Sequence, residues 1–225
     1  MKQEILRFNF NYISNEFFVS SKNSLAFKII KNWPDWQVNC VFLYGPKKCG
    51  KSSLAKIWQK NSGAIYLDKV HFENLMNINF DLKKITSKSW IIENLDNILT
   101  NKENHEKILN FLNILKTYNS FLLITSLNSP KLLNIKLQDL VSRLAASLVV
   151  EVKELDDELM IRIIEKYFDE RGIRLDSSVI SYICNRIERT YTSTIKMVKL
   201  IDEHSLSNGR KITKQFVSNL IRTCY

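Results

Sequence analysis

The sequence lacks the features that mark disulfide-stabilised, zinc-binding and membrane-spanning proteins. Its four cysteines, Cys40, Cys49, Cys184 and Cys224, are widely spaced without a CxxC pair, and only three histidines occur in 225 residues. Neither a disulfide framework nor a zinc site is therefore expected. No run of 18 uncharged apolar residues occurs, and residues 1–12 contain no apolar segment of the secretory type. We expect a soluble, cytoplasmic protein without membrane contact.

Acidic residues are fewer than basic ones. The chain has 23 Asp and Glu against 33 Lys and Arg, which gives a net charge of +10. Such a surface attracts polyanions, so weak, non-specific contact with DNA is one expectation. The basic residues are scattered through a chain rich in Lys, Asn and Ile, which fits a general compositional bias equally well. Composition alone leaves both alternatives open.

Short apolar runs alternate with amphipathic stretches through the first two thirds of the chain. Runs of this kind are typical of strands that are buried on both faces. They are Val41–Tyr44, Ala64–Leu67, Trp90–Ile92, Phe121–Thr125 and Leu148–Val152, with helices predicted over Leu54–Lys60 and Glu106–Tyr118. This alternation predicts an α/β fold with a parallel five-stranded sheet.

The pattern changes to helices alone after about residue 155. Asp156 or Asp157, Asp176 and Thr213 stand where they can cap helices with apolar stripes, and Gly172 stands where the first of these helices should stop. We therefore expect a nucleotide-binding α/β domain over residues 13–154, a small all-α lid domain over residues 155–225, and a tail over residues 1–12.

The segment GPKKCGKS, residues 45–52, matches the P-loop pattern G-x-x-x-x-G-K-[ST]. A predicted strand precedes it and a predicted helix follows it, so backbone N–H groups and a helix N-terminus would converge on phosphate oxygens. Lys51 would reach the β- and γ-phosphates, and Ser52 would bind Mg²⁺. The expected nucleotide contacts are Gly45, Pro46, Lys47, Lys48, Cys49, Gly50, Lys51, Ser52 and Ser53. We expect Cys49 to be an inert loop residue; the alternative is a reactive thiol whose pKa is lowered by the helix N-terminus, Lys48 and Lys51.

A second acidic site follows the apolar run Trp90–Ile92. Glu93 stands where a Walker B carboxylate emerges, and we expect it to contribute to the nucleotide and Mg²⁺ site together with Ser52. The next residue is Asn94, whose amide cannot act as a general base, and Asp96 lies two residues further on. These residues predict nucleotide binding with weakened hydrolysis.

Together these motifs resemble a known family. The P-loop, the Glu93 segment, SRLAASLVVEV at 142–152 and the helical tail are similar to the AAA+ module of the bacterial replication initiator DnaA, and in particular to its short Hda homologues of the alphaproteobacterial form. The resemblance implies an AAA+ P-loop NTPase fold that binds ADP or ATP with Mg²⁺. It also implies DnaA as a partner, and assembly with further copies of the chain is compatible with it.

The resemblance assigns roles to further residues. Val19 and Asn23, within FFVSSKNS, fall where the family contacts adenine, and Arg143, within LQDLVSRLAAS, falls at the arginine finger that acts on a neighbouring subunit. A surface ion pair is the alternative role for Arg143. The family's sensor arginine in the third lid helix is replaced by Thr192, so Arg189 is the candidate substitute. The first sensor residue is one of Thr125, Ser126 and Asn128.

The hexapeptide QEILRF, residues 3–8, resembles the ligands of the bacterial sliding clamp. Gln3, Leu6 and Phe8 match Q-x-x-[LM]-x-[FL], in which Gln binds a pocket rim and the apolar side chains fill the pocket. Packing of Ile5, Phe8 and Phe10 onto the body is the alternative. No helix-turn-helix domain follows the lid in this sequence, so no sequence-specific DNA reader is expected.

These observations predict a regulatory AAA+ adaptor. It would bind the clamp of DNA polymerase III and stimulate ATP hydrolysis by DnaA through Arg143, which would prevent re-initiation of replication. The first alternative is an AAA+ ATPase that loads a helicase or remodels DNA, and the second is a small P-loop kinase. The ATPase alternative predicts appreciable intrinsic turnover that depends on Lys51 and Glu93.

Overall fold

The computed structural model describes residues 17, 19, 22–77 and 89–224. Its first part is a five-stranded parallel sheet in the order β2-β3-β4-β1-β5. The strands are β1 (Cys40–Tyr44), β2 (Ile65–Leu67), β3 (Trp90–Ile92), β4 (Leu122–Ser126) and β5 (Leu148–Glu151). The predicted α/β class and parallel five-stranded sheet are confirmed, and each predicted strand agrees with the observed one to within one residue at either end.

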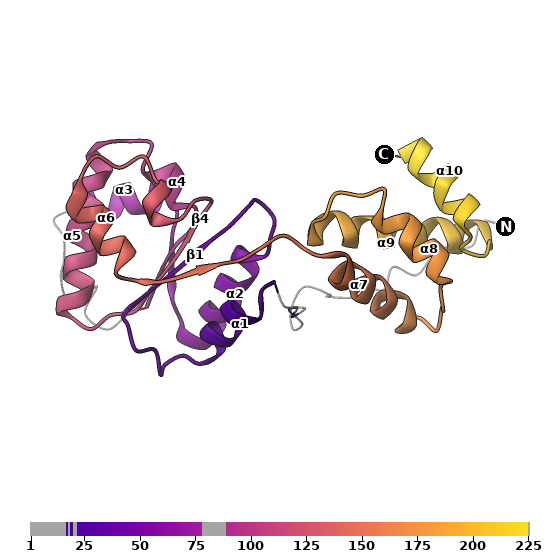
Figure 1. Ribbon diagram of the computed structural model, residues 1–225, viewed down its shortest axis with the longest axis horizontal. Helices are drawn as coiled ribbons and strands as arrows, with labels where there is room; N and C mark the ends of the chain where they lie inside the picture. The colour runs from indigo at the N-terminus through magenta and orange to yellow at the C-terminus, as the bar shows by residue number, and fades with distance from the viewer. Residues whose placement is uncertain (1–16, 18, 20–21, 78–88, 225) are drawn as a thin grey trace.

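Helices cover both faces of this sheet (Figure 1). They are α1 (Ser24–Lys31), α2 (Lys51–Ser62), α3 (Lys69–Asn77), α4 (Leu95–Ile98), α5 (Glu103–Thr117) and α6 (Gln138–Ala145), with a 3₁₀ turn η2 (Pro130–Leu132) before α6. Helices α2 and α5 start earlier than predicted, whereas α1, α3, α4 and α6 were not predicted as helices.

Alternate side chains of the central strands enter two different cores. On β1, Phe42 joins the cluster that contains residues of α4, α5 and α6, whereas Val41 and Leu43 join the cluster that contains residues of α1 and α2. This period of two follows from the pleat of a strand that is buried on both faces. The layers hold β1 rigidly, so the loop that leaves its carboxyl end has a fixed position.

Aromatic residues fill one end of the α1–α2 layer. Trp36 stacks on Trp58 with ring centroids 5.0 Å apart, and Trp33 meets Trp58 edge-on at 6.3 Å. Phe121 contacts both Trp33 and Trp36 edge-on. Such ring pairs stabilise packing beyond the burial of area alone. They anchor α2, the helix that follows the P-loop.

The C-terminal part is a helical unit with its own core. It contains α7 (Asp157–Asp169), α8 (Ser177–Cys184), α9 (Tyr191–Asn208) and α10 (Lys214–Cys224), and its core cluster is drawn from residues 155–221 alone. Asp156 accepts a hydrogen bond from Leu159 N at 2.8 Å, and Thr213 accepts one from Phe216 N at 3.2 Å. The predicted caps at Asp156 and Thr213 are confirmed, because each satisfies an N–H group at a helix start. No helix among the described residues is both long and apolar enough to span a bilayer.

Candidate nucleotide-binding site

The P-loop connects β1 to α2 at the carboxyl edge of the sheet. Gly45 N donates to Ser126 O at 3.3 Å, which ties the start of the loop to β4. Lys48 and Gly50 have positive φ angles of 62° and 108°, so the loop curls tightly before α2 begins at Lys51. Ser52 and Ser53 are exposed in the first turn of α2. The helix N-terminus, with no acidic residue in its first turn, favours an anion at this position.

Lys51 is buried inside the loop. Its ammonium donates hydrogen bonds to Gly45 O and Pro46 O, both at 2.7 Å, and lies 3.6 Å from Cys49 Sγ. The cation therefore lies within the curl of the loop, where the sequence pattern predicts phosphate contacts. Lys47 is exposed on the same loop.

Cys49 is 4% exposed. Burial raises the pKa of its thiol, and this effect outweighs the favourable charge and hydrogen bonds of Lys51. The alternative of a reactive thiol with a lowered pKa is therefore wrong, because the helix N-terminus and the lysine act on a group that has lost its hydration. The expected inert cysteine agrees with the structure.

The β3 segment lies beside β4 at the same edge of the sheet. Glu93 is half-buried directly after β3, and Asn94 follows with φ 54° and donates its N–H to Thr125 Oγ1 at 3.0 Å. Thr125, at 1% exposed, thus contacts the segment that carries Glu93. Among the three sensor candidates, this contact favours Thr125.

Asp96 has a different role from Glu93. Its carboxylate accepts hydrogen bonds from Leu127 N at 2.7 Å and from Ser126 Oγ at 2.9 Å, and Asn128 Nδ2 approaches it at 3.4 Å. These contacts fix the loop after β4. Because both of its carboxylate oxygens are used in this way, Asp96 holds the loop and does not replace the missing base at Asn94.

An aromatic pair borders the other side of the loop. Phe17 lies against Gly50, where an added Cβ would be 3.2 Å from the ring, and it stacks on Phe27 at 5.5 Å. Asn23 is 5% exposed and its carbonyl accepts from Phe27 N, whereas Val19 is 37% exposed. Phe17 is a site residue that the sequence reasoning missed, although it lies two positions before Val19.

The lid contacts the P-loop through an ion pair. Lys48 Nζ lies 2.9 Å from Glu188 Oε2, and Glu188 also accepts from Ser193 Oγ at 3.1 Å. The hydrogen bond from Lys48 holds the pKa of Glu188 below its ordinary value, with a further contribution from Ser193. The neighbouring Arg189 pairs with Asp157 at 3.1 Å, at the start of α7.

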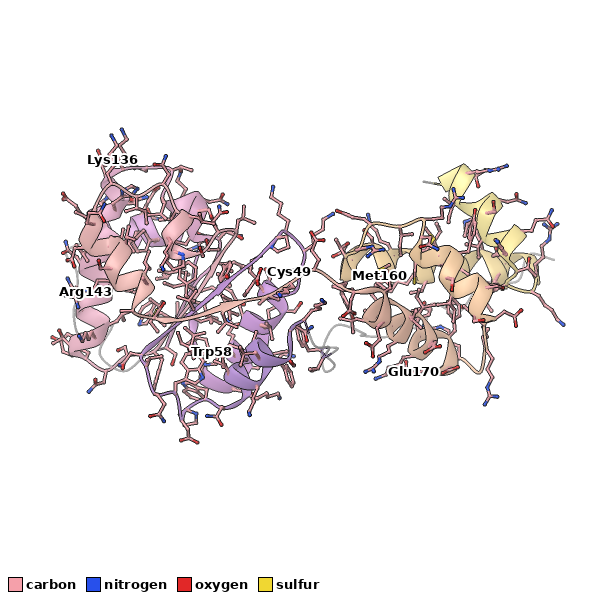
Figure 2. All side chains as sticks on the ribbon, viewed as in Figure 1. Cys49, Trp58, Lys136, Arg143, Met160 and Glu170 are labelled. Atoms are coloured by element: carbon pink, nitrogen blue, oxygen red, sulfur yellow. The ribbon has the colours of Figure 1, made fainter. Side chains whose placement is uncertain are left out.

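Arg143 lies on α6, on the opposite side of the α/β body from Cys49 and the P-loop (Figure 2). Its side chain is 40% exposed and its Nε is 3.7 Å from Asp139 Oδ1, one turn earlier on the same helix. The surface ion pair, the alternative role for Arg143, is present. An arginine so placed does not serve the P-loop of its own chain.

The comparisons with known proteins agree with this geometry. Residues 156–221 match the family model of the Hda lid domain. The lid thus resembles the lid domain of Hda proteins. An uncharacterized protein of Haemophilus influenzae is 24% identical over 200 residues, which are 85% of each chain.

Solved structures similar to this chain establish the AAA+ fold. Domain III of DnaA from Thermotoga maritima has a TM-score of 0.73 at 18% identity, over 92% of this chain and 94% of that one. AMPPCP-bound DnaA from Aquifex aeolicus also has a TM-score of 0.73, at 21% identity over 86% of this chain and 66% of that one. The RuvB branch migration motor from Thermotoga maritima has a TM-score of 0.63 at 16% identity, over 83% of this chain and 62% of that one.

Two predicted sites stand apart from this geometry. Gln3, Leu6 and Phe8, with the whole predicted clamp-binding tail, lie outside the described residues. Among the described residues, no group of three or more His, Cys, Asp or Glu side chains could hold a metal ion. The Ser52 hydroxyl and the Glu93 carboxylate still fit Mg²⁺ chemically, because Mg²⁺ takes few protein oxygens and completes its shell with phosphates and water.

Proposed function

We propose that this chain is a regulatory adaptor that stimulates ATP hydrolysis by DnaA and so restrains re-initiation of replication. The observation that carries the proposal is the position of Arg143, which is exposed on α6 and remote from the chain's own P-loop. A guanidinium delivered across a subunit interface offsets the charge that develops on a neighbour's transferred phosphoryl group. Such an arginine accelerates hydrolysis by about 10³ to 10⁵.

The surface next to α6 offers a place for a partner to dock. A cleft of about 640 Å³ lies between the α4–α5 region and the segment from η2 to α6, and its lining includes Leu99, Leu132 and Leu137. Leu132 is 74% exposed. An exposed apolar side chain at the edge of a cleft is a feature that protein interfaces favour.

We further propose that the P-loop binds ADP or ATP with Mg²⁺ and hydrolyses it slowly. Lys51 and the loop backbone would bind the phosphates, Ser52 and Glu93 would hold Mg²⁺, and Val19 and Asn23 would lie near adenine. Bound Mg²⁺ would neutralise phosphate charge. Slow hydrolysis is expected because Asn94 cannot accept a proton and Asp96 is occupied by the loop after β4. In this proposal Arg189 would contact the nucleotide, because the neighbouring Glu188 already pairs with Lys48 of the P-loop.

Arg143→Ala is the direct test, and Arg162→Ala is its matched control. Both arginines are exposed on helices and pair with a carboxylate four residues earlier, Asp139 and Glu158 respectively. The assay is hydrolysis of ATP by DnaA with clamp loaded on DNA. We expect Arg143→Ala to abolish the stimulation and Arg162→Ala to retain it. Equal stimulation by both variants would refute the finger role.

The clamp contact needs a separate test, because residues 3–8 lie outside the described structure. Gln3→Ala combined with Leu6→Ala and Phe8→Ala should abolish pull-down with the sliding clamp. The control is Arg143→Ala, which should bind the clamp as the unsubstituted chain does. Clamp binding that survives the triple substitution would remove the tail from the proposal.

A DNA-remodelling ATPase is the second candidate, and the structural similarity to the RuvB motor favours it. It predicts rapid intrinsic turnover that Lys51→Ala and Glu93→Gln both abolish. The adaptor proposal predicts slow turnover in the unsubstituted chain. Measurement of hydrolysis by the isolated chain with and without DNA separates the two candidates.

A further inference from the structure

The charges of the lid are unevenly divided along the chain. Residues 155–181 contain seven Asp and Glu against four Lys and Arg, whereas residues 182–222 contain eight Lys and Arg against three Asp and Glu. The positive charge is concentrated in residues 209–222, which contain four Lys and Arg and no Asp or Glu. These residues include most of α10, which packs on α8, whereas α7 packs on α8 and α9. The part of the lid around α10 is therefore strongly basic.

Four exposed cations lie around α10, one just after α8, two in the turn before α10 and one at the start of α10. We call this set the α8–α10 basic cluster; its members are Arg186, Arg210, Lys211 and Lys214. Arg186 and Lys214 lie 5.1 and 5.4 Å from the centroid of the same ring, that of Tyr182. Two like charges thus share one aromatic ring, which attracts each of them.

No acidic partner neutralises this cluster. Within residues 22–77 and 89–224, none of its four side chains forms an ion pair. By contrast, Arg162, Arg171 and Arg189 of the same lid pair with Glu158, Asp202 and Asp157. These three acids are thus paired elsewhere, and the α8–α10 basic cluster keeps its full positive charge.

The backbone holds these cations in place. Gly209 ends α9 with φ 59°, Ser205 Oγ donates to Arg210 O at 2.7 Å, and Arg210 N donates to Ser205 O at 3.2 Å. Thr213 caps the next helix. The turn that carries Arg210 and Lys211 is therefore fixed at both ends, so binding a ligand there costs little backbone ordering.

We propose that the α8–α10 basic cluster is a docking surface for the sugar–phosphate backbone of duplex DNA. Fixed, unpaired and exposed cations bind phosphates without regard to sequence. The ring of Tyr182 is half-buried and its hydroxyl bonds Ser218 at 3.1 Å, so it offers no free platform on which single-stranded bases could stack.

An anionic membrane fits the same surface less well. Insertion into a bilayer needs a helix with a free apolar face, but Val217 and Leu220 of α10 are buried in the lid core. Leu206 is the single large apolar side chain of the described lid that is well exposed, at 63%, and one such leucine is ordinary on a soluble surface.

The location makes this contact independent of the proposed function. In Figure 1, α10 lies at the end of the molecule farthest from the sheet, whereas α6 is on the far side of the α/β body. DNA on the lid would leave the Arg143 surface free. The inference therefore stands whether or not the chain stimulates DnaA.

The test replaces the four cations together by glutamine, and its matched control replaces four exposed lysines of the α/β body, Lys28, Lys56, Lys116 and Lys131. Both variants lose the same net charge. Fluorescence polarisation with a labelled duplex of arbitrary sequence, from about 50 to 200 mM salt, gives affinity and its salt dependence.

For four phosphate contacts the slope of log K against log salt has a magnitude of about 3.6. We expect the lid variant to lose about 10-fold or more in affinity at low salt and most of that slope, and the control to stay near the unsubstituted chain. A double variant, Arg210→Gln with Lys211→Gln, leaves Tyr182 and its two cations intact and should lower the slope by about 1.8.

Three outcomes would overturn the proposal. The first is an equal loss in both four-residue variants, which would indicate a net-charge effect. The second is unchanged DNA binding by the folded four-residue lid variant or by the double variant. This holds even if the variant no longer binds phosphatidylserine vesicles. The third is tighter binding to single-stranded than to duplex DNA.

Discussion

Substitution of Gly45 should destabilise the protein more than substitution of the other glycine of the P-loop, for a reason that does not involve nucleotide binding. An added Cβ would lie 2.0 Å from Val152 O, and φ at Gly45 is 150°. An ordinary carbon–oxygen contact is about 3.4 Å, so in Gly45→Ala the end of β5 must move away by about 1.4 Å. That movement would stretch the hydrogen bond from Val152 N to Tyr44 O, which is 2.7 Å long.

The expected cost of Gly45→Ala adds three effects. Forced overpacking costs about 1 to 3 kcal/mol, loss of a buried hydrogen bond about 1 to 3 kcal/mol, and an unfavourable positive φ about 1 to 2 kcal/mol. The lower ends together give about 3 kcal/mol, which corresponds to a fall in Tm of about 6 to 12 °C for a chain of this size.

Gly63→Ala is the control for this prediction, measured by calorimetry under the same conditions. Gly63 also has a positive φ, 66°, and also lies in the α/β body, but an added Cβ meets nothing within 4 Å. Its expected cost is about 1 kcal/mol, or about 2 to 4 °C. If Gly45→Ala lowers Tm no more than Gly63→Ala does, the close approach of Val152 to the loop is not a real constraint.

Three further predictions concern the lid and the loop. Asp202→Asn should destabilise the lid by about 3 kcal/mol, because it leaves the mostly buried Arg171, now 2.8 Å from the carboxylate, without a counter-charge; a change in urea midpoint equivalent to less than about 1 kcal/mol would contradict this. A double-mutant cycle with Lys48→Ala and Glu188→Gln should give a favourable coupling free energy between the two side chains at neutral pH. This coupling should be lost as pH falls below 4.5, because the pKa of Glu188 is lowered in the folded state and the carboxylate becomes protonated in acid. Coupling that persists in acid would show that charge is not its source. Cys49 should react with a thiol reagent at pH 8 far more slowly than it does in urea, since burial raises its pKa; equal rates would mean that the loop opens readily.

Local patterns sufficed to predict most of the fold. Buried strands are apolar along their whole length, so runs such as Trp90–Ile92 stand out from amphipathic surroundings. Helix α1 was missed because its eight residues, SLAFKIIK, were interpreted only through their resemblance to a nucleotide-binding segment. Helix α3 has no strong apolar stripe, and its cap signal, Asp68, which accepts a hydrogen bond from His71 N at 2.8 Å, was not used.

The contacts within the site could not be predicted in the same way. Lys48 and Glu188 are 140 residues apart, and Asp96 reaches a loop about 30 residues later. Such pairs depend on how the strands and the lid are arranged, and periodicity in the sequence contains no information on that arrangement. The position of Arg143 opposite the P-loop likewise follows from the sheet order, not from its local motif.

The aromatic packing behind α2 has a consequence for experiments on this protein. All four tryptophans, Trp33, Trp36, Trp58 and Trp90, belong to the α/β body, and the lid contains tyrosine as its only fluorescent residue type apart from phenylalanine. Emission excited at the red edge of the indole band therefore reports on the body alone. Compared with circular dichroism, to which the helices of both parts contribute, it would show whether the two parts unfold together or in separate steps.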